Sequence, residues 1–256
     1  MIFMKKYILA NPSGNITALV TEPCSKSEYT SVADEIMKLE PAVEQVGFVY
    51  DSGGLHCLDM AGGEFCGNAS LSAAAYFLRQ QAGVYENPSS ANAVTLKVSG
   101  ASKPLEVSIS SDGKGYRGTI AMPLPKEIST FDGMPVVNFE GISHMIISSD
   151  RIPPAIAEAV IRDNCARLGV PAFGMLLWDE HKQFMRPLVY VRDADTLFWE
   201  HCCASGSCAV TSYYAYKNAV DIKMTVNQPG GSVEVDAAYD KGRITKLFMT
   251  GAVSFS

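Results

Sequence analysis

The sequence predicts an α+β protein made of two similar halves. Strand-like segments run along the whole of its 256 residues, and each half has one helix rich in small residues. One of these helices follows Cys66 and the other follows Cys203. A serine lies four residues after each cysteine and a tyrosine lies ten residues after it, at an offset of 203 − 66 = 137 residues. Because this offset is about half of the chain, we interpret the match as a duplication.

Three patterns define the elements of the first half. Short apolar runs beside turns of Asn, Pro and Gly indicate strands, and apolar residues at helical spacing indicate the first helix. The segment at residues 68–81 is rich in Ala, Ser and Leu and lacks Pro and Gly, which predicts a buried helix. We therefore expect strands at residues 7–9, 16–20, 46–50, 55–60, 94–98 and 105–110, and helices at residues 27–40 and 68–81.

The second half repeats this alternation. Pro153 and Pro154 suit the first turn of a helix, and the apolar residues after them continue at helical spacing. A run rich in Ser and Ala after Cys203 predicts a second small-residue helix. We expect strands at residues 136–137, 144–147, 175–178 and 188–191 and around Val233 and Leu247, and helices from residue 153 through 161 and at 205–217.

The composition limits the class of protein. Hydrophobic residues make up 47% of the chain and charged residues 19%, which excludes intrinsic disorder. The formal net charge of −6 argues against binding to nucleic acid or to an anionic membrane. No apolar run approaches the roughly 18 residues of a membrane span, and the first residues lack the apolar stretch of a signal peptide. The seven cysteines are an odd number and unevenly spaced, unlike a secreted disulfide framework, so we expect a cytoplasmic protein.

Cys66 and Cys203 are the candidate catalytic residues. Each precedes a predicted helix, whose first N–H groups and partial positive charge stabilise a thiolate and can also bind a carboxylate. If the two helix ends face each other, one thiolate can remove a proton from one side of a carbon while the other thiol returns a proton on the opposite side. The alternative is that small residues follow each cysteine only because the helices pack closely. We favour function because the two contexts match.

Other functional interpretations have weaker support. The His-Cys-Cys segment at residues 201–203 and Cys208 have a spacing near that of zinc ligands, but a helix that begins near residue 205 directs these side chains apart. His56 or His144 could pair with a cysteine as in papain-like proteases, although a single histidine is more often structural. The sequence has no Gly-x-Gly-x-x-Gly fingerprint and no phosphate loop, so no nucleotide cofactor is indicated.

The two cysteine motifs together resemble those of the diaminopimelate epimerase superfamily. They read Glu-Phe-Cys-Gly-Asn-Ala at residues 64–69 and Cys-Ala-Ser-Gly at residues 203–206. The resemblance covers nearly the whole chain and is strongest to the histidine racemases of the superfamily. Four further stretches are similar to these racemases: Asn-Pro-Ser-Gly-Asn at 11–15, Glu-Gln-Val-Gly-Phe at 44–48, Trp-Glu at 199–200 and Gln-Pro-Gly-Gly-Ser at 228–232.

This resemblance implies an architecture and a way of working. The family has two pseudo-symmetric domains, each a mixed sheet or partial barrel wrapped around a central helix, and acts without a cofactor. We accordingly expect one domain at residues 1–115 and the other at 116–256, with the last strand able to return to the first domain. The resemblance further implies a homodimer and no metal site.

The resemblance also assigns roles to individual residues. Cys66 and Cys203 correspond to the two acid/base thiols. Backbone N–H groups of Gly67, Asn68, Ala204 and Ser205 are expected to hold the substrate carboxylate, Asn15 and Gln45 to line the site, and Glu200 to hold the substrate ammonium. Ala204 stands where the family usually has Gly, and its Cβ narrows the space for the carboxylate.

Departures from the epimerases favour a substrate with one amino-acid centre. Met60, Ile142 and Asp179 stand where the epimerases use Asn for the distal centre of diaminopimelate, and the corresponding Arg is missing before Cys203. We therefore expect an amino-acid racemase acting on histidine, with Glu44 or Asp179 binding the imidazole. The first alternative is a phenazine-biosynthesis-like isomerase, which relies on a glutamate near Glu44 and has no second cysteine. A diaminopimelate epimerase and a non-catalytic zinc-binding or ligand-binding module are the others.

Overall fold

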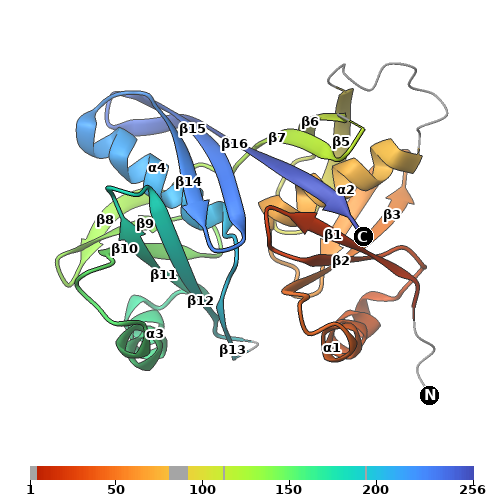
Figure 1. Cartoon of the computed structure of the whole chain (residues 1–256), viewed down its shortest axis with the longest axis horizontal. Helices are drawn as coiled ribbons and strands as arrows, with labels where there is room; N and C mark the ends of the chain where they lie inside the picture. Colours follow the sequence, from red (N-terminus) through yellow and green to blue (C-terminus); the bar gives the residue numbers. More distant parts are fainter. Residues whose placement is uncertain (1–4, 81–91, 112, 194) are drawn as a thin grey trace. The chain divides into compact units, whose positions relative to one another are not determined.

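The computed structural model describes residues 5–80, 92–111, 113–193 and 195–256. Strands with a few helices make up these residues, which confirms the predicted α+β class. They form two compact units (Figure 1): one spans residues up to Ala121 together with Thr250–Ser256, and the other spans Met122–Met249. The predicted helix end at residue 81 lies outside the described residues.

Eight strands of the first unit form a closed barrel. Strands β1 to β7 pair in chain order, and β16 pairs with both β7 and β1, so the sheet returns on itself. The closure places Ala10 opposite Phe255 and Pro12 opposite Val253. The strands are β1 (Tyr7–Pro12), β2 (Thr17–Val20), β3 (Gln45–Ser52), β4 (Leu55–Met60), β5 (Asn92–Val98), β6 (Leu105–Ser111), β7 (Tyr116–Ala121) and β16 (Arg243–Phe255), whose residues up to Met249 belong to the second unit.

Helix α2 (Gly67–Gln80) packs against all of the strands from β1 to β7 (Figure 1). Eleven of its fourteen residues are buried, and the three alanines at 73–75 have no accessible surface. A helix that contacts so many strands of a small barrel needs short side chains on every face, which explains its Ala and Ser content. Gly118 on β7 provides further room, because a Cβ there would lie 2.9 Å from a methyl group of Leu71.

A second helix of this unit packs on β3. Helix α1 (Tyr29–Leu39) follows the 3-10 turn η1 (Lys26–Glu28). The ring of Tyr29 stacks on the ring of Phe48 with centroids 3.7 Å apart, and Val32 and Ile36 are buried in the same cluster. The amphipathic spacing that predicts this helix therefore corresponds to its contact with the sheet.

The second unit is one sheet with a helix on each face. Alternation along β11 separates the two faces: Met175 and Leu177 pack with helix α3, whereas Leu176 and Trp178 pack in the cluster of helix α4. The sheet order is β16, β15, β14, β12, β11, β10, β9, β8, and β13 pairs with β12. Bounds are β8 (Glu127–Phe131), β9 (Met134–Asn138), β10 (Ser143–Ser148), α3 (Pro154–Leu168), β11 (Ala172–Asp179), β12 (Phe184–Val191), β13 (Thr196–Trp199), α4 (Ala204–Asn218), β14 (Ile222–Gln228) and β15 (Gly231–Asp240).

The two small-residue helices begin where the sequence predicts, to within one residue, since α2 starts at Gly67 and α4 at Ala204. Helix α4 contacts β9, β10, β14 and β15. Strands β7, β8, β13 and β14 are additions to the sequence-based expectation. The pseudo-symmetry of the two halves and the central position of both helices stay predictions.

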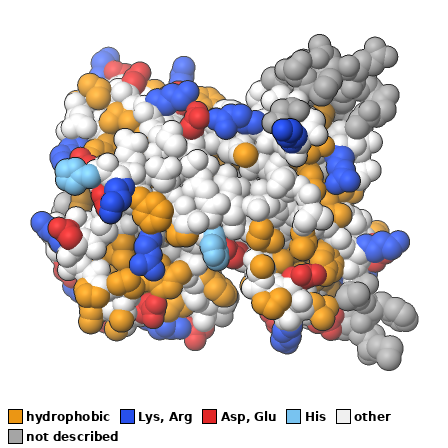
Figure 2. All heavy atoms as spheres, in the orientation of Figure 1, with side chains coloured by type: hydrophobic (Ala, Val, Ile, Leu, Met, Phe, Trp, Pro, Cys, Tyr) orange, Lys and Arg blue, Asp and Glu red, His pale blue; other side chains and the backbone are white. Residues whose placement is uncertain are grey.

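Charged side chains of both signs are interspersed on the face drawn in Figure 2. Neither sign covers a continuous area of the described surface in that view, in keeping with a modest net charge of −6. Among the described residues, every helix is too short or too polar to cross a membrane.

Candidate active site

Cys66 lies at the start of α2, in the first unit. The Ala69 N–H donates to Cys66 Sγ at 3.3 Å, and Ser70 donates to the Cys66 carbonyl from its N–H at 3.0 Å and from its hydroxyl at 2.7 Å. The thiol itself donates to Gln45 Oε1, at the beginning of β3, at 2.8 Å. The sulfur is therefore held at the positive end of a buried helix, where a thiolate is stabilised.

Cys203 has the same arrangement at the start of α4, in the second unit. It is the N-cap residue with an extended backbone, φ −109° and ψ 108°, and its Sγ accepts from the Gly206 N–H at 3.4 Å. Ser207 donates to the Cys203 carbonyl from its N–H at 3.0 Å and from its hydroxyl at 2.8 Å. The serine four residues after each cysteine thus binds the same carbonyl in both units, so the repeated motif has a repeated local structure.

The two thiols differ in their hydrogen-bond partners. Cys66 is half-buried and donates to the neutral amide of Gln45. Cys203 is 5% exposed, donates to the Glu200 carboxylate and lies 3.6 Å from Ser205 Oγ. Burial, and then the charge and hydrogen bond of Glu200, raise the pKa of the Cys203 thiol well above its usual range, while the bonds from Ser205 and the helix N–H oppose this. Cys203 is therefore a protonated thiol at neutral pH.

A buried histidine contacts Ser205. His144 Nε2 on β10 lies 2.9 Å from Ser205 Oγ, and the ring has no accessible surface. Its Nδ1 has no hydrogen-bond partner among the described residues. Burial lowers the pKa of His144 to about 3, so the ring is neutral at physiological pH. Gly174, its neighbour on β11, provides the space, because a Cβ there would overlap the ring and lie 2.7 Å from His144 Cε1.

In the first unit, the other predicted polar residues join one network. Asn15 is completely buried; its Nδ2 donates to Glu44 Oε2 at 2.6 Å, and its Oδ1 accepts from Asn68 Nδ2 at 3.3 Å. Asn68 is the second residue of α2, and Glu44 precedes Gln45, whose amide binds the Cys66 thiol. The structure therefore brings these predicted residues together around the start of α2.

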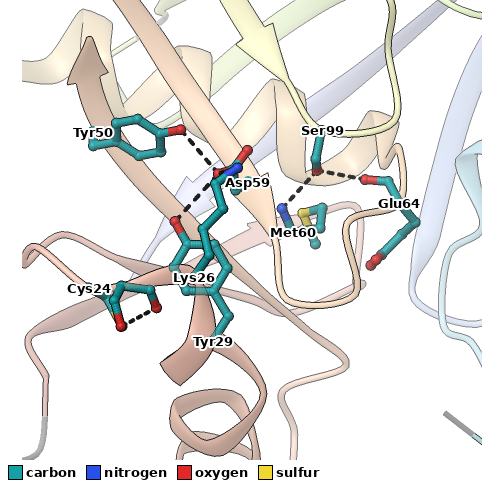
Figure 3. A network of polar contacts seen from close by, with 9 residues as sticks. Cys24, Lys26, Tyr29, Tyr50, Asp59, Met60, Glu64 and Ser99 are labelled. Atoms are coloured by element: carbon teal, nitrogen blue, oxygen red, sulfur yellow. Dashed lines mark hydrogen bonds and ion pairs between the residues drawn. The ribbon is translucent and has the colours of Figure 1, made fainter.

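The loop before Cys66 is held by a serine that the sequence analysis did not identify. Ser99, just after β5, accepts from the Met60 N–H at 2.9 Å and donates to the Glu64 carbonyl at 2.8 Å (Figure 3). These two bonds join the end of β4 to the residues that lead into Cys66. They fix the approach of the chain to the start of α2.

Strand β4 is further fixed by a half-buried carboxylate, that of Asp59, one residue before the end of the strand. Asp59 Oδ2 accepts from the Tyr50 hydroxyl at 3.0 Å and from the Tyr29 hydroxyl at 3.4 Å, and pairs with Lys26 Nζ at 2.8 Å (Figure 3). Burial and the charge of Asp59 raise the pKa of Tyr29 to about 12. The Tyr29 hydroxyl therefore keeps the proton that it donates at neutral pH. The cluster connects η1, α1, β3 and β4.

The remaining predicted residues lie as follows. Gly67 is the first residue of α2, and Ala204 and Ser205 are the first two of α4, where a helix has no carbonyl of its own for the N–H groups. Asp179 accepts from the Lys182 N–H at 3.1 Å and pairs with Lys182 Nζ at 3.1 Å, in the turn after β11. Neither contact joins it to the neighbours of Cys203. Within the described ranges, no three His, Cys, Asp or Glu side chains are grouped to hold a metal ion.

Gln228 is a second contact of a cysteine segment that the sequence analysis missed. Its Oε1 accepts from the Cys203 N–H at 2.7 Å. The two residues are 25 positions apart, so no local spacing relates them. The signal in the sequence was the Gln-Pro-Gly-Gly-Ser stretch, which the resemblance singles out without a role for its glutamine.

The family model and the curated relatives that match this chain are all described as histidine racemases. The sequence model of the family described as "Histidine racemase CntK N-terminal domain" matches residues 4–256. A histidine racemase of Staphylococcus aureus is 32% identical over 243 residues, covering 88% of this chain and 85% of the relative. A histidine racemase of Fusobacterium nucleatum is 32% identical over 240 residues, covering 89% of this chain and 88% of the relative.

Solved structures resemble the chain in fold alone, because their sequence identities are low. A Pseudomonas aeruginosa protein described as a predicted epimerase has a TM-score of 0.71 at 13% identity, covering 98% of this chain and 97% of that protein. A phenazine biosynthesis protein of the PhzF family from Bacillus anthracis has a TM-score of 0.69 at 14% identity, covering 97% and 96%. A probable proline racemase from Agrobacterium radiobacter has a TM-score of 0.61 at 12% identity, covering 98% and 91%.

Proposed function

This chain belongs to the histidine racemase family and is an isomerase of the amino-acid racemase and epimerase class, and we propose that it racemises histidine with Cys66 and Cys203 as its two acid/base residues. The observation that carries the proposal is the repeated cap, in which each cysteine stands at the start of a buried helix and accepts from the N–H three residues on. A structural cysteine has no need of this arrangement in both units.

The proposed reaction moves two protons and no other atoms. One thiolate takes the α-proton from one face of the substrate, and the other thiol donates its proton to the opposite face of the same carbon. The first residue is then a thiol and the second a thiolate, so the product enantiomer is set for the reverse reaction. The raised pKa of Cys203 supports its starting as the thiol, with Cys66 as the base in the same state of the enzyme.

Glu200 is proposed to act on both the thiol and the substrate. Its carboxylate accepts the hydrogen bond of Cys203, so it keeps that proton in place until the substrate needs it. When Cys203 donates its proton, the same carboxylate is available to the positively charged substrate ammonium. A charge that favours the thiol also disfavours the thiolate, so Glu200 biases the direction in which Cys203 works.

The helix starts are proposed to hold the substrate carboxylate. Negative charge grows on this group as the α-proton leaves, and N–H groups with a helix dipole stabilise that charge. The donors in the proposal are the N–H groups of Gly67 and Asn68 on α2 and of Ala204 and Ser205 on α4. No cofactor is required in this scheme, because the protein's own dipoles stabilise the carbanion-like state.

Glu44 is the better supported of the two candidates for the imidazole. Asn15 fixes its carboxylate at 2.6 Å, next to Gln45 and the start of α2. Asp179 is instead paired with Lys182 in the turn after β11. We therefore propose that Glu44 binds the substrate side chain, while Asn15 and Gln45 line the site. A cytoplasmic homodimer is proposed as well, and light scattering on the purified protein measures its mass in solution.

Exchange of the α-proton in deuterated water tests the proposed reaction. We expect deuterium uptake and inversion with L- and D-histidine and none with diaminopimelate. Cys66→Ser and Cys203→Ser should each lower racemisation by at least roughly 100-fold, as expected for loss of a general acid or base. Residual exchange should be confined to one enantiomer and should concern opposite enantiomers in the two variants. Cys24→Ser, at a partly exposed thiol outside both caps, is the matched control.

Two results would contradict the proposal. Full racemisation by either serine variant would exclude the two-thiol assignment. Exchange with diaminopimelate, or isomerisation of a substrate that keeps its α-configuration, would replace histidine racemisation with one of the alternative functions. A different substrate or reaction would leave the fold and the two cysteine caps unchanged and would concern the substrate alone.

A further inference from the structure

We propose that Gln228 is a positioning residue for Cys203, holding the peptide of that cysteine so that its sulfur stays at the start of α4. The inference rests on the proposed function only in taking Cys203 as one of the two acid/base residues. Gln228 is the last residue of β14 and is 4% exposed. It opens the Gln-Pro-Gly-Gly-Ser stretch, to which the mechanism above gives no role.

Every polar group of the Gln228 side chain is in use. Oε1 accepts from the Cys203 N–H at 2.7 Å, and Nε2 donates to Ser207 Oγ at 3.0 Å and to Cys202 Sγ at 3.2 Å. A backbone N–H can bind only an acceptor, so Cys203 determines which end of the amide faces it. The amide nitrogen is thereby directed to Ser207 and Cys202.

These bonds hold the backbone of Cys203 on both sides of its Cα, at the N–H and at the carbonyl. The Ser207 hydroxyl accepts from Gln228 and donates to the Cys203 carbonyl at 2.8 Å. Gln228 therefore binds the N–H of Cys203 directly and its carbonyl through Ser207. One backbone bond strengthens the connection, because the Gly230 N–H donates to the His201 carbonyl at 2.9 Å. The turn after β14 and the segment before α4 are thus joined by backbone and side chain together.

The position of the Cys203 backbone determines where its sulfur and the first N–H groups of α4 lie. Proton transfer requires the sulfur within hydrogen-bond reach of the α-carbon, and a displacement of about 1 Å can lower the rate by about 100-fold. With the Cys203 N–H bound to Gln228 and the Gly206 N–H bound to the sulfur, the N–H groups of Ala204 and Ser205 are the ones assigned to the substrate carboxylate. The N–H groups of Cys203 and Gly206 therefore hold the cap, and in the proposal those of Ala204 and Ser205 hold the substrate.

Three variants separate positioning from a general loss of stability. Gln228→Leu removes all three hydrogen bonds of the Gln228 side chain and replaces it with a side chain of similar size. Gln228→Glu keeps an acceptor for the Cys203 N–H, but only its protonated form has a donor for Ser207. Asn227→Leu is the matched control, because this neighbouring amide on β14 is exposed and donates to the Lys182 carbonyl at 3.4 Å.

We expect Gln228→Leu to lower kcat for histidine racemisation by roughly 100-fold with a much smaller change in KM, because the acid/base group is displaced while substrate binding is largely retained. Asn227→Leu should match the wild type. The kcat of Gln228→Glu relative to the wild type should rise as the pH is lowered, because protonation of the introduced carboxyl restores the donor. The same ratio for Gln228→Leu should not change with pH. Circular dichroism and melting temperature at each pH identify the folded proteins.

A folded Gln228→Leu enzyme with the kcat of the wild type would overturn the inference. If that variant does not fold, Gln228→Glu decides, and a kcat ratio that is independent of pH would overturn it equally. Failure of the proposed function has a different signature: the wild type would not racemise histidine, or Cys203→Ser would remain active. The two ideas can therefore fail separately.

Discussion

Gly174→Ala provides a quantitative test of how the second unit holds His144. Gly174 lies opposite His144 in the parallel pair of β10 and β11. A Cβ at this position would overlap the imidazole and lie 2.7 Å from Cε1. The ring has nowhere to move, because it has no accessible surface and its Nε2 binds Ser205 at 2.9 Å. The added methyl must therefore displace either the ring or the strand.

The expected destabilisation has two parts. Overpacking of a closed site by one methyl group typically costs about 1–3 kcal/mol. Displacement of the ring also breaks its bond to Ser205, at about 1 kcal/mol for an ordinary hydrogen bond. Together they lower the free energy of unfolding by roughly 2–4 kcal/mol. Gly47→Ala is the comparison, because its Cβ would meet a terminal methyl group of the Leu58 side chain at 2.7 Å, and moving that methyl group breaks no hydrogen bond. It should cost less.

Urea unfolding of a double-mutant cycle measures the effect. Removing the ring in His144→Ala leaves room for the methyl group, so Gly174→Ala should cost little in that background. The difference between the two costs is the interaction energy of the pair. Equal costs in the presence and absence of the ring would refute the reasoning, because the strand and not the imidazole would then limit the space. Histidine racemisation by Gly174→Ala, compared with Gly47→Ala, reports whether the bond to Ser205 affects Cys203.

Two further predictions concern protonation. The pKa of His144 is about 3 in the folded protein against about 6.5 when unfolded, so the unfolded state binds more protons between these values. The free energy of unfolding should therefore fall as the pH is lowered below about 6.5, by up to about 1.4 kcal/mol per pH unit from this residue, and His144→Asn should lose that part of the slope in urea titrations. Glu200→Gln removes the charge that adds to burial in raising the pKa of Cys203. Alkylation of Cys203, followed by peptide mass spectrometry, should then begin at lower pH, with Cys66 unchanged; an unchanged onset at Cys203 would exclude the contact with Glu200.

The elements that the sequence predicts well are those with a buried face. Strand β4 and helices α2 and α4 have local patterns that match their burial. Strand β8 has no buried residue and exists through its pairing with β9, so hydrophobic periodicity does not reveal it. Strand β14 is different: Ile222, Met224 and Val226 alternate with exposed residues, and this period was available in the sequence.

The residues of the candidate site also differ in whether their contacts are local in the sequence. The cysteine caps are local, because every group within a cap lies within four residues of its cysteine. They could therefore be predicted from a cysteine before a small-residue run. Ser99 and Gln228 act on segments 35 and 25 residues away, so only the strand pairing brings them there. The asymmetry between the thiols depends first on burial, which follows from the fold and not from the spacing, and then on the charge of the neighbouring Glu200.

The last strand has a consequence for the order in which the protein can be built. Strand β16 is the eighth strand of the barrel in the first unit. It pairs with β1, whose residues lie more than 240 positions earlier in the chain. The first seven strands leave the ribosome long before β16. Until β16 follows, the edges of β1 and β7 that pair with it have no partner strand. The second unit has all of its residues earlier, since it ends at Met249. Synthesis therefore completes the residues of the second unit first, and the barrel of the first unit closes only when residues 250–256 have emerged.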